Sequence, residues 1–98
     1  MLIKIHESCR LTIAICDSDL IDKKFEEGIK QLDLTGSFFK GEEKTEQEAT
    51  EIIEDSQKED ATFNIVGKQS CDLALKLGIV EKSGIITIQD IPIALVLL

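Results

Sequence analysis

The chain has 98 residues, of which 43% are hydrophobic, and a formal net charge of −8. This length suits a single domain over residues 1–98, large enough to bury a core without disulfides or metals. No apolar run reaches the roughly 18 residues of a membrane span, and MLIKIHESCR lacks the apolar segment of a signal peptide. Three cysteines without a CxxC pair are typical of a reducing compartment, so we expect a cytoplasmic protein without a membrane partner.

The negative charge is concentrated in one segment. Residues 42–60 carry nine acids and two lysines, a net charge of −7, so the rest of the chain is close to neutral. An acidic segment repels phosphate backbones and attracts basic partners. The chain has four Phe and no Trp or Tyr, which also counts against stacking on nucleic-acid bases.

In the first half of the chain, the spacing of apolar residues changes from two to four and back to two. LIKIHES and RLTIAIC alternate apolar and polar residues, which predicts two strands joined by a turn at residues 7–10. Ile21 and Phe25 are then four residues apart, with capping residues at 17–19 and a glycine stop at Gly28, which predicts a helix over 17–28. Residues 29–34 alternate again and predict a third strand. The following glycine-bracketed loop can carry a short strand at Phe38–Phe39.

The second half contains two more predicted helices. Thr45 and Glu48 form a capping box, which predicts a surface helix over Thr45–Gln57 with a thin apolar stripe. TFNIVG predicts a strand, and Lys68–Leu77 predicts a helix that ends at Gly78. The inward face of that last helix is expected to comprise Cys71, Ala74, Leu75 and Gly78.

GIITI and IALVLL predict two final strands. The predicted order β-β-α-β-α-β-α-β-β indicates an α+β (or α/β) fold, a single two-layer domain with a mixed sheet. The apolar C-terminal strand is expected to be an interior strand covered on both faces. If it lay at an edge instead, it would be a seam for a homodimer.

The junction at Gly67 is the first candidate site. A helix N-terminus attracts anions, and Lys68 would add a full positive charge beside it, with Asn64 and His6 as further ligand contacts. Such a site would bind a small phosphate-bearing ligand or support an enzyme activity. The chain lacks GxxxxGK[ST] and GxGxxG around this single glycine, so a tight turn between strand and helix is the simpler interpretation.

His6, Cys9 and Cys16 form the second candidate group, for metal binding or nucleophilic catalysis. Their spacing does not match the paired ligands of structural zinc sites, and no orienting group or oxyanion hole is visible. Cys71 fits a small buried apolar position in its helix. We therefore predict no metal, no cofactor and no catalytic residues, and enzyme activity is the minority interpretation.

The acidic helix is the third candidate. Its acids either form a solvated face or dock a basic partner, with Glu46, Glu51 and Glu54 as the proposed contacts. The favoured function is a non-enzymatic interaction module, including one that joins a ribonucleoprotein through its protein part. Direct RNA binding is possible but not favoured; it would need a basic face assembled from Lys4, Arg10, Lys23, Lys24 and Lys30.

Several weak motifs occur together in one order: LIKIH, KKFEEG at residues 23–28, the acidic helix, and NIVG at 64–67 before LALKLGIV. Over about residues 2–95 this order resembles an archaeal family, domain of unknown function 424. The resemblance implies a small archaeal cytoplasmic protein and supplies no reaction. The family's last strand begins with proline and histidine, whereas Ile93 follows Pro92 here, which weakens the case for a histidine-dependent activity. The positions matching the family pattern are Lys4, His6, Asp17, Phe25, Gly28, Asn64, Gly67 and Lys68.

Overall fold

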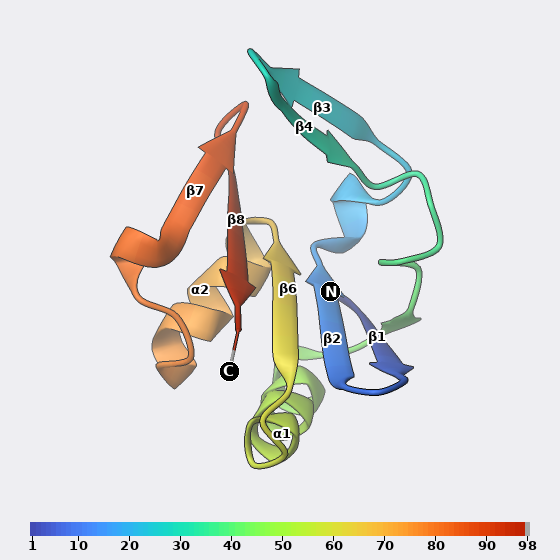
Figure 1. Ribbon diagram of the computed structural model, residues 1–98, viewed down its shortest axis with the longest axis vertical. Coiled ribbons are helices and arrows are strands. Elements are labelled where there is room, and N and C mark those ends of the chain that lie inside the picture. The colour runs from blue at the N-terminus through green and yellow to red at the C-terminus, as the bar shows by residue number, and fades with distance from the viewer. Residues whose placement is uncertain (98) are drawn as a thin grey trace.

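The computed structural model describes residues 1–97, which form one large sheet, a small hairpin and two α-helices (Figure 1). The strands are β1 (Leu2–Glu7), β2 (Leu11–Cys16), β3 (Lys24–Glu27), β4 (Lys30–Asp33), β5 (Glu42–Glu43), β6 (Thr62–Val66), β7 (Ile85–Ile88) and β8 (Ile91–Val96). The α-helices are α1 (Glu46–Gln57) and α2 (Lys68–Leu77), and the short 3-10 helices are η1 (Ser18–Leu20) and η2 (Lys82–Gly84).

The large sheet is mixed. Its strand order is β5-β1-β2-β6-β8-β7, and β3 pairs with β4 in a separate hairpin. The central pair, β2 and β6, is parallel, with Ala14 opposite Asn64, while the other neighbouring strands are antiparallel. The fold is therefore α+β with a mixed sheet, as the sequence predicts.

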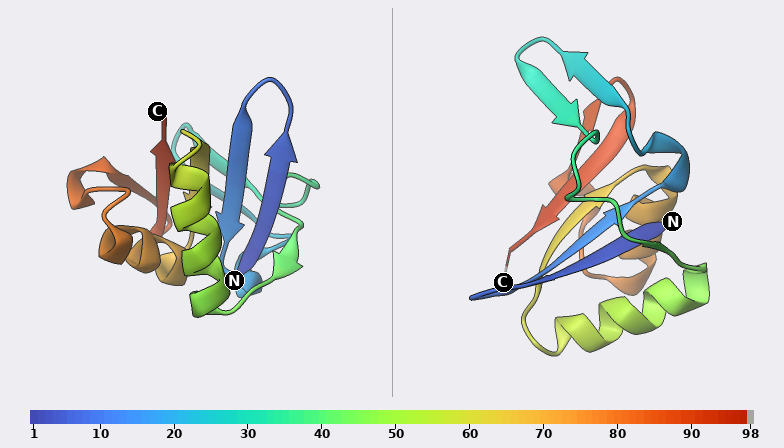
Figure 2. Two further views of the ribbon diagram at one scale, coloured as in Figure 1. Left: turned by 90° about the horizontal axis from the view of Figure 1, so that it is seen from below. Right: turned by 90° about the vertical axis from the view of Figure 1, so that its right-hand side faces the viewer.

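Both α-helices pack on one face of this sheet (Figure 2). Ile13 and Ile15 of β2 and Phe63 of β6 are fully buried against Ile53 of α1 and Ala74 of α2. Ile13 and Ile15 are two residues apart and so lie on the same face, as the alternation of side chains in a strand requires, and Phe63 lies opposite Ile13 on the neighbouring strand. Burial of this apolar face is the main stabilising contribution to the domain.

The other face of the sheet is only partly covered. The β3–β4 hairpin and the chain after it pack on one end, where Leu34, Cys16 and Val66 form a second buried cluster. Farther along this face, Leu95 is 56% exposed, and none of the helices described covers it. None of the helices within residues 1–97 is long and apolar enough to cross a membrane.

Both later helices are confirmed. Thr45 caps α1 with the predicted reciprocal capping box, in which Glu48 N–H donates to Thr45 Oγ1 over 3.2 Å. The helix α2 spans Lys68–Leu77 and ends at Gly78 in the left-handed conformation, with φ of 75°. The predicted inward face of α2 is partly wrong, because Leu73 is buried while Leu75 is half-buried and Gly78 is exposed.

The predicted helix over residues 17–28 is wrong. Only the turn η1 forms there, and the chain then enters β3, where Phe25 lies opposite Leu32 of β4. Gly28 does adopt a left-handed conformation, φ 61°, but in the tight turn of this hairpin and not at a helix end. The alternation in residues 24–27 is compatible with a strand, and pairing with residues 30–33 favours it over a helix. The short strand expected at Phe38–Phe39 is also wrong, since that segment is a turn.

The C-terminal strand is interior, as predicted, because β8 lies between β6 and β7. Its predicted coverage on both faces is wrong, since Leu95 is largely exposed. The backbone of β8 pairs with β6 over Ile93–Val96 and with β7 over Ile91–Ala94, so the edge position on which the homodimer seam depends is not found.

Candidate functional site

The N-terminus of α2 lies where the two central parallel strands end. Since β2 and β6 run in the same direction, Asp17, after β2, comes next to Gly67, after β6. Asp17 is 6% exposed, and its carboxylate accepts hydrogen bonds from Gln69 N–H (3.0 Å), Ser70 N–H (2.8 Å) and the Ser70 hydroxyl (2.7 Å). The protein thus supplies its own anion to the donors at this helix end.

Gly67 is required by this arrangement. Its φ of 109° is a conformation that residues with a side chain rarely adopt. A Cβ atom on Gly67 would also overlap the Asp17 carboxylate. Gly67 therefore has a complete structural explanation, as the tight-turn interpretation requires.

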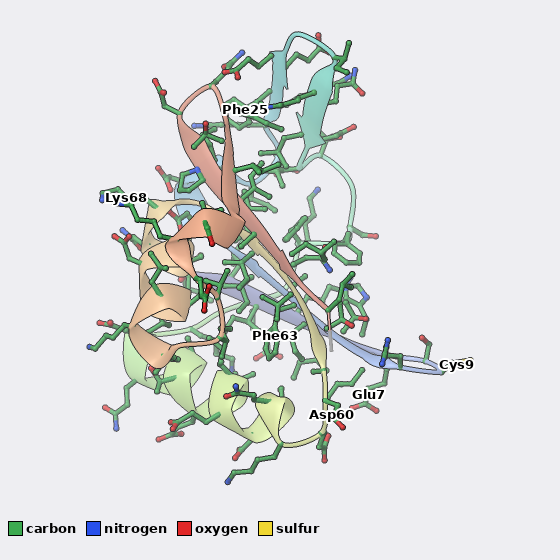
Figure 3. All side chains as sticks on the ribbon, turned by 60° about the vertical axis from the view of Figure 1, so that its left-hand side comes forward. Glu7, Cys9, Phe25, Asp60, Phe63 and Lys68 are labelled. Atoms are coloured by element: carbon green, nitrogen blue, oxygen red, sulfur yellow. The ribbon has the colours of Figure 1, made fainter. Side chains whose placement is uncertain are left out.

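The remaining predicted ligand contacts do not gather at Gly67. Lys68 points into solvent (Figure 3) and pairs with Asp72 of the next helical turn at 3.4 Å. His6 lies on β1, where its ring stacks on Phe38 with a centroid distance of 4.4 Å and its Nε2 is 2.9 Å from the Phe38 carbonyl. Asn64, on β6, is half-buried opposite Ala14. An external anion at Gly67 would have to displace Asp17.

The cysteines and His6 also remain apart. Cys9 is exposed at the tip of the β1–β2 hairpin (Figure 3), whereas Cys16 and Cys71 are buried. Burial raises the pKa of Cys16 to about 12 and the pKa of Cys71 to about 11, and the charge of Asp17 adds to both shifts. Both buried thiols stay protonated at neutral pH, so they are poor nucleophiles and poor metal ligands. Within residues 1–97, no group of three or more His, Cys, Asp or Glu side chains could hold a metal ion.

The acids of α1 fall into two groups. Glu48 belongs to the capping box, and Glu46 forms an ion pair with Lys76 of α2 at 3.7 Å. The other acids of the helix are exposed and have no ion-pair partner among residues 1–97; we call them the acidic face, which consists of Glu51, Glu54 and Asp55. Their spacing of three and four residues places them on one side of the helix.

The position of the acidic face is unfavourable for the helix itself. Glu54 and Asp55 lie near the C-terminus of α1, where the helix dipole favours cations, and the last turn has no basic residue. Like charges three or four residues apart also repel each other. Stability of α1 therefore does not explain these acids. The sequence alone identifies their charge, and the structure adds that no cation of residues 1–97 pairs with them.

Sequence reasoning missed the role of Asp17. The sequence offers Asp17 as a cap for a helix immediately after it, whereas in the structure Asp17 caps α2, which begins 51 residues later. A local capping pattern carries no signal for such a contact.

Comparison with known proteins identifies relatives without an assigned activity. A crystal structure of an uncharacterized conserved protein from Methanopyrus kandleri has the same fold, with a TM-score of 0.83 and 21% sequence identity. The match covers 98% of this chain and 90% of that chain. A search of curated proteins found no match. Residues 6–98 match the family model described as a protein of unknown function (DUF424), so this chain belongs to the DUF424 family, as its motifs suggest.

Proposed function

We propose that the protein is a non-enzymatic interaction module that docks a basic surface of a partner protein through the acidic face of α1. The observation that supports this is the acidic face, whose three acids have no ion-pair partner among residues 1–97. Glu54 and Asp55 lower helix stability, and none of the three acids forms an ion pair within the part of the chain that the structure describes, so a function outside the chain accounts for their presence. The partner can be a free protein or the protein part of a ribonucleoprotein.

Exposed charges of this kind raise the association rate and the binding specificity more than they raise the affinity. Binding through the acidic face should weaken as salt concentration rises, because the charges are fully exposed to screening. Glu46 is a secondary contact, since it can exchange Lys76 for a partner cation at little cost.

The test is capture of partners from a native lysate by three forms of the tagged protein, with and without ribonuclease. One form is unmodified, and the second carries Glu46→Gln, Glu51→Gln and Glu54→Gln. The third is a control with the same charge change elsewhere on the surface, Asp19→Asn, Glu81→Gln and Asp90→Asn. A protein partner that resists ribonuclease, is lost from the α1 variant and is kept by the control supports the proposal. Equal capture by all three forms would leave the acidic face with a solubility role alone.

A small-anion function at Gly67 and Lys68 is the competing proposal. It requires a phosphate-bearing ligand to take the donors that Asp17 now occupies. A thermal shift with phosphate-bearing metabolites that Lys68→Ala abolishes would support it. A ribonuclease-sensitive partner in the capture experiment, together with RNA affinity that falls steeply with salt, would instead favour RNA binding.

A further inference from the structure

The outer edge of β1 is unpaired over most of its length. The strand β5 pairs with β1 only at Leu2 and Ile3. Within residues 1–97, no strand pairs with the outer side of Lys4–Glu7. The chain leaves this edge at Gly41, where it passes so close to the Ile3 carbonyl that a Cβ atom would not fit. An unpaired edge of this kind is a template for another extended segment.

The backbone groups that face this edge can be assigned from the strand geometry. Lys44 N–H donates to the Met1 carbonyl over 2.8 Å, so the carbonyl of Met1 points toward β5. Because successive residues of a strand alternate their hydrogen-bonding direction, Ile5 and Glu7 also present their N–H and C=O groups outward. Lys4 and His6 point theirs toward β2.

A cavity of about 540 Å³ adjoins this edge. Ile3, Ile5 and Ile52 provide its apolar lining, and Ile5 is 49% exposed. Lys4, Lys40 and Lys44 also line it, together with Gly41 and one carboxylate, Glu42. We call the edge Lys4–Glu7 together with this cavity the β1 groove. In Figure 3 the β1–β2 hairpin projects from the body of the molecule toward Cys9, so the edge near Glu7 is accessible.

The lysines of the β1 groove hold their present partners weakly. Lys40 pairs with Asp22 at 2.7 Å and Lys44 with Glu42 at 3.1 Å, and both carboxylates are exposed. Lys4 donates to the Ser37 carbonyl over 2.9 Å and has no carboxylate partner within residues 1–97. Surface ion pairs are worth little, so a ligand carboxylate can replace them.

We propose that the β1 groove binds an extended peptide of a partner protein that runs antiparallel to β1 and is acidic toward its C-terminal end. The chain itself provides the precedent, since β5 is an acidic strand that pairs antiparallel with the first part of the same edge. A peptide in line with β5 would place its C-terminal end near the three lysines and its N-terminal end beside Glu7. Main-chain hydrogen bonds would supply affinity, and the apolar cavity would select an aliphatic side chain.

The test uses a fluorescein-labelled hexapeptide with the sequence Lys-Val-Thr-Val-Glu-Glu. Its control has the same composition in reverse order. We expect saturable binding of the first peptide and at least about tenfold weaker binding of the second, a difference of about 1.4 kcal/mol. The double variant Lys4→Glu and Lys40→Glu should lose the same factor. The matched variant Lys30→Glu and Lys82→Glu, with the same charge change at exposed sites elsewhere, should not.

Amide hydrogen exchange locates the bound peptide. The N–H groups of Ile5 and Glu7 should exchange quickly in the free protein and slowly with the peptide, while those of Lys4 and His6 are protected in both. Ile5→Pro removes one outward donor from an edge position and should abolish binding with the fold intact. The proposal is overturned if the peptide does not bind up to about 1 mM, if the reversed peptide binds equally, or if protection appears elsewhere. The β1 groove is proposed to bind an acidic peptide, whereas the acidic face of α1 is proposed to bind a basic surface. Either proposal can therefore fail without the other.

Discussion

The carboxylate of Asp17 caps a helix that begins 51 residues later in the chain, through its hydrogen bonds to Ser70 at 2.8 and 2.7 Å. This contact joins the end of β2 to the start of α2, the helix that follows β6, so it links the two strands of the central parallel pair at one end. It satisfies helix donors that would otherwise be buried without partners.

Asp17→Ala should therefore lower the free energy of unfolding by about 2 kcal/mol, because it removes the cap and leaves the N–H and hydroxyl groups of Ser70 buried and unpaired. Urea denaturation followed by circular dichroism measures this change. Asp19→Ala, an exposed carboxylate in the same turn, is the control and should change it by less than about 0.5 kcal/mol. Equal effects of the two variants would contradict the capping role.

Gly67→Ala should be more destabilising than Gly28→Ala, although both glycines have positive φ. At Gly28 nothing lies within 4 Å of an added Cβ, so the cost is the backbone strain alone, about 1 kcal/mol. At Gly67 the added Cβ overlaps Asp17, so we expect at least about 2 kcal/mol in the same denaturation experiment. The double variant Asp17→Ala, Gly67→Ala should lose less than the sum of the two single variants. Simple additivity would show that the two residues do not interact.

Cys9 should be the only thiol to react with a disulfide reagent near pH 8 in the folded protein, because it is exposed while Cys16 and Cys71 are buried and protonated. All three cysteines should react after unfolding in denaturant. Cys9→Ser, which leaves both buried thiols in place, should abolish the reaction of the folded protein. Rapid labelling of a second site would contradict the burial described here.

The same buried thiols make stability depend on alkaline pH. The pKa of Cys16 rises from 9.0 to about 12 on folding, so the unfolded chain loses this proton first as pH increases. The contribution is fully present below pH 9 and is lost as pH rises from 9 toward 12. Cys16→Ala should flatten this part of the pH–stability curve, measured by thermal unfolding, whereas Cys9→Ala should leave it unchanged.

Glu54→Gln should stabilise α1 slightly, by about 0.3 kcal/mol, because it removes a negative charge from the C-terminal turn of the helix. The same substitution should weaken partner binding if the acidic face is the docking surface. Glu46→Gln, at the N-terminal end, should instead be neutral or destabilising, since the helix dipole favours an acid there. A stability loss in Glu54→Gln would show that this acid has a structural role.

Local signals in the sequence account for much of the fold. The capping box at Thr45 and the left-handed Gly78 determine where helices begin or end, so α1 and α2 are predicted within one residue. Strict alternation likewise predicts β1 and β2, whose buried face needs a period of two.

The errors arise where a local pattern fits two structures. The spacing of Ile21 and Phe25 suits a helix face, but Phe25 also alternates with its charged neighbours, and its pairing with Leu32 favours the strand. The candidate anion site shows the same limit, because Gly67 has the local features of such a site while Asp17 reaches it only through the tertiary fold. The cavity beside β1 likewise depends on the path of the chain at Gly41.

The parallel pairing of β2 with β6 also affects how the chain folds during synthesis. The β1–β2 hairpin can form as soon as residue 16 has left the ribosome, but its inner neighbour begins only at Thr62. Until then the inner edge of β2 has no partner strand, and the apolar side chains of Ile13 and Ile15 lack the cover that β6 and α2 provide in the folded domain. Pairings between distant segments slow folding and expose such edges to aggregation. We therefore expect the nascent chain to need protection at β2 for as long as α1 and β6 are being made.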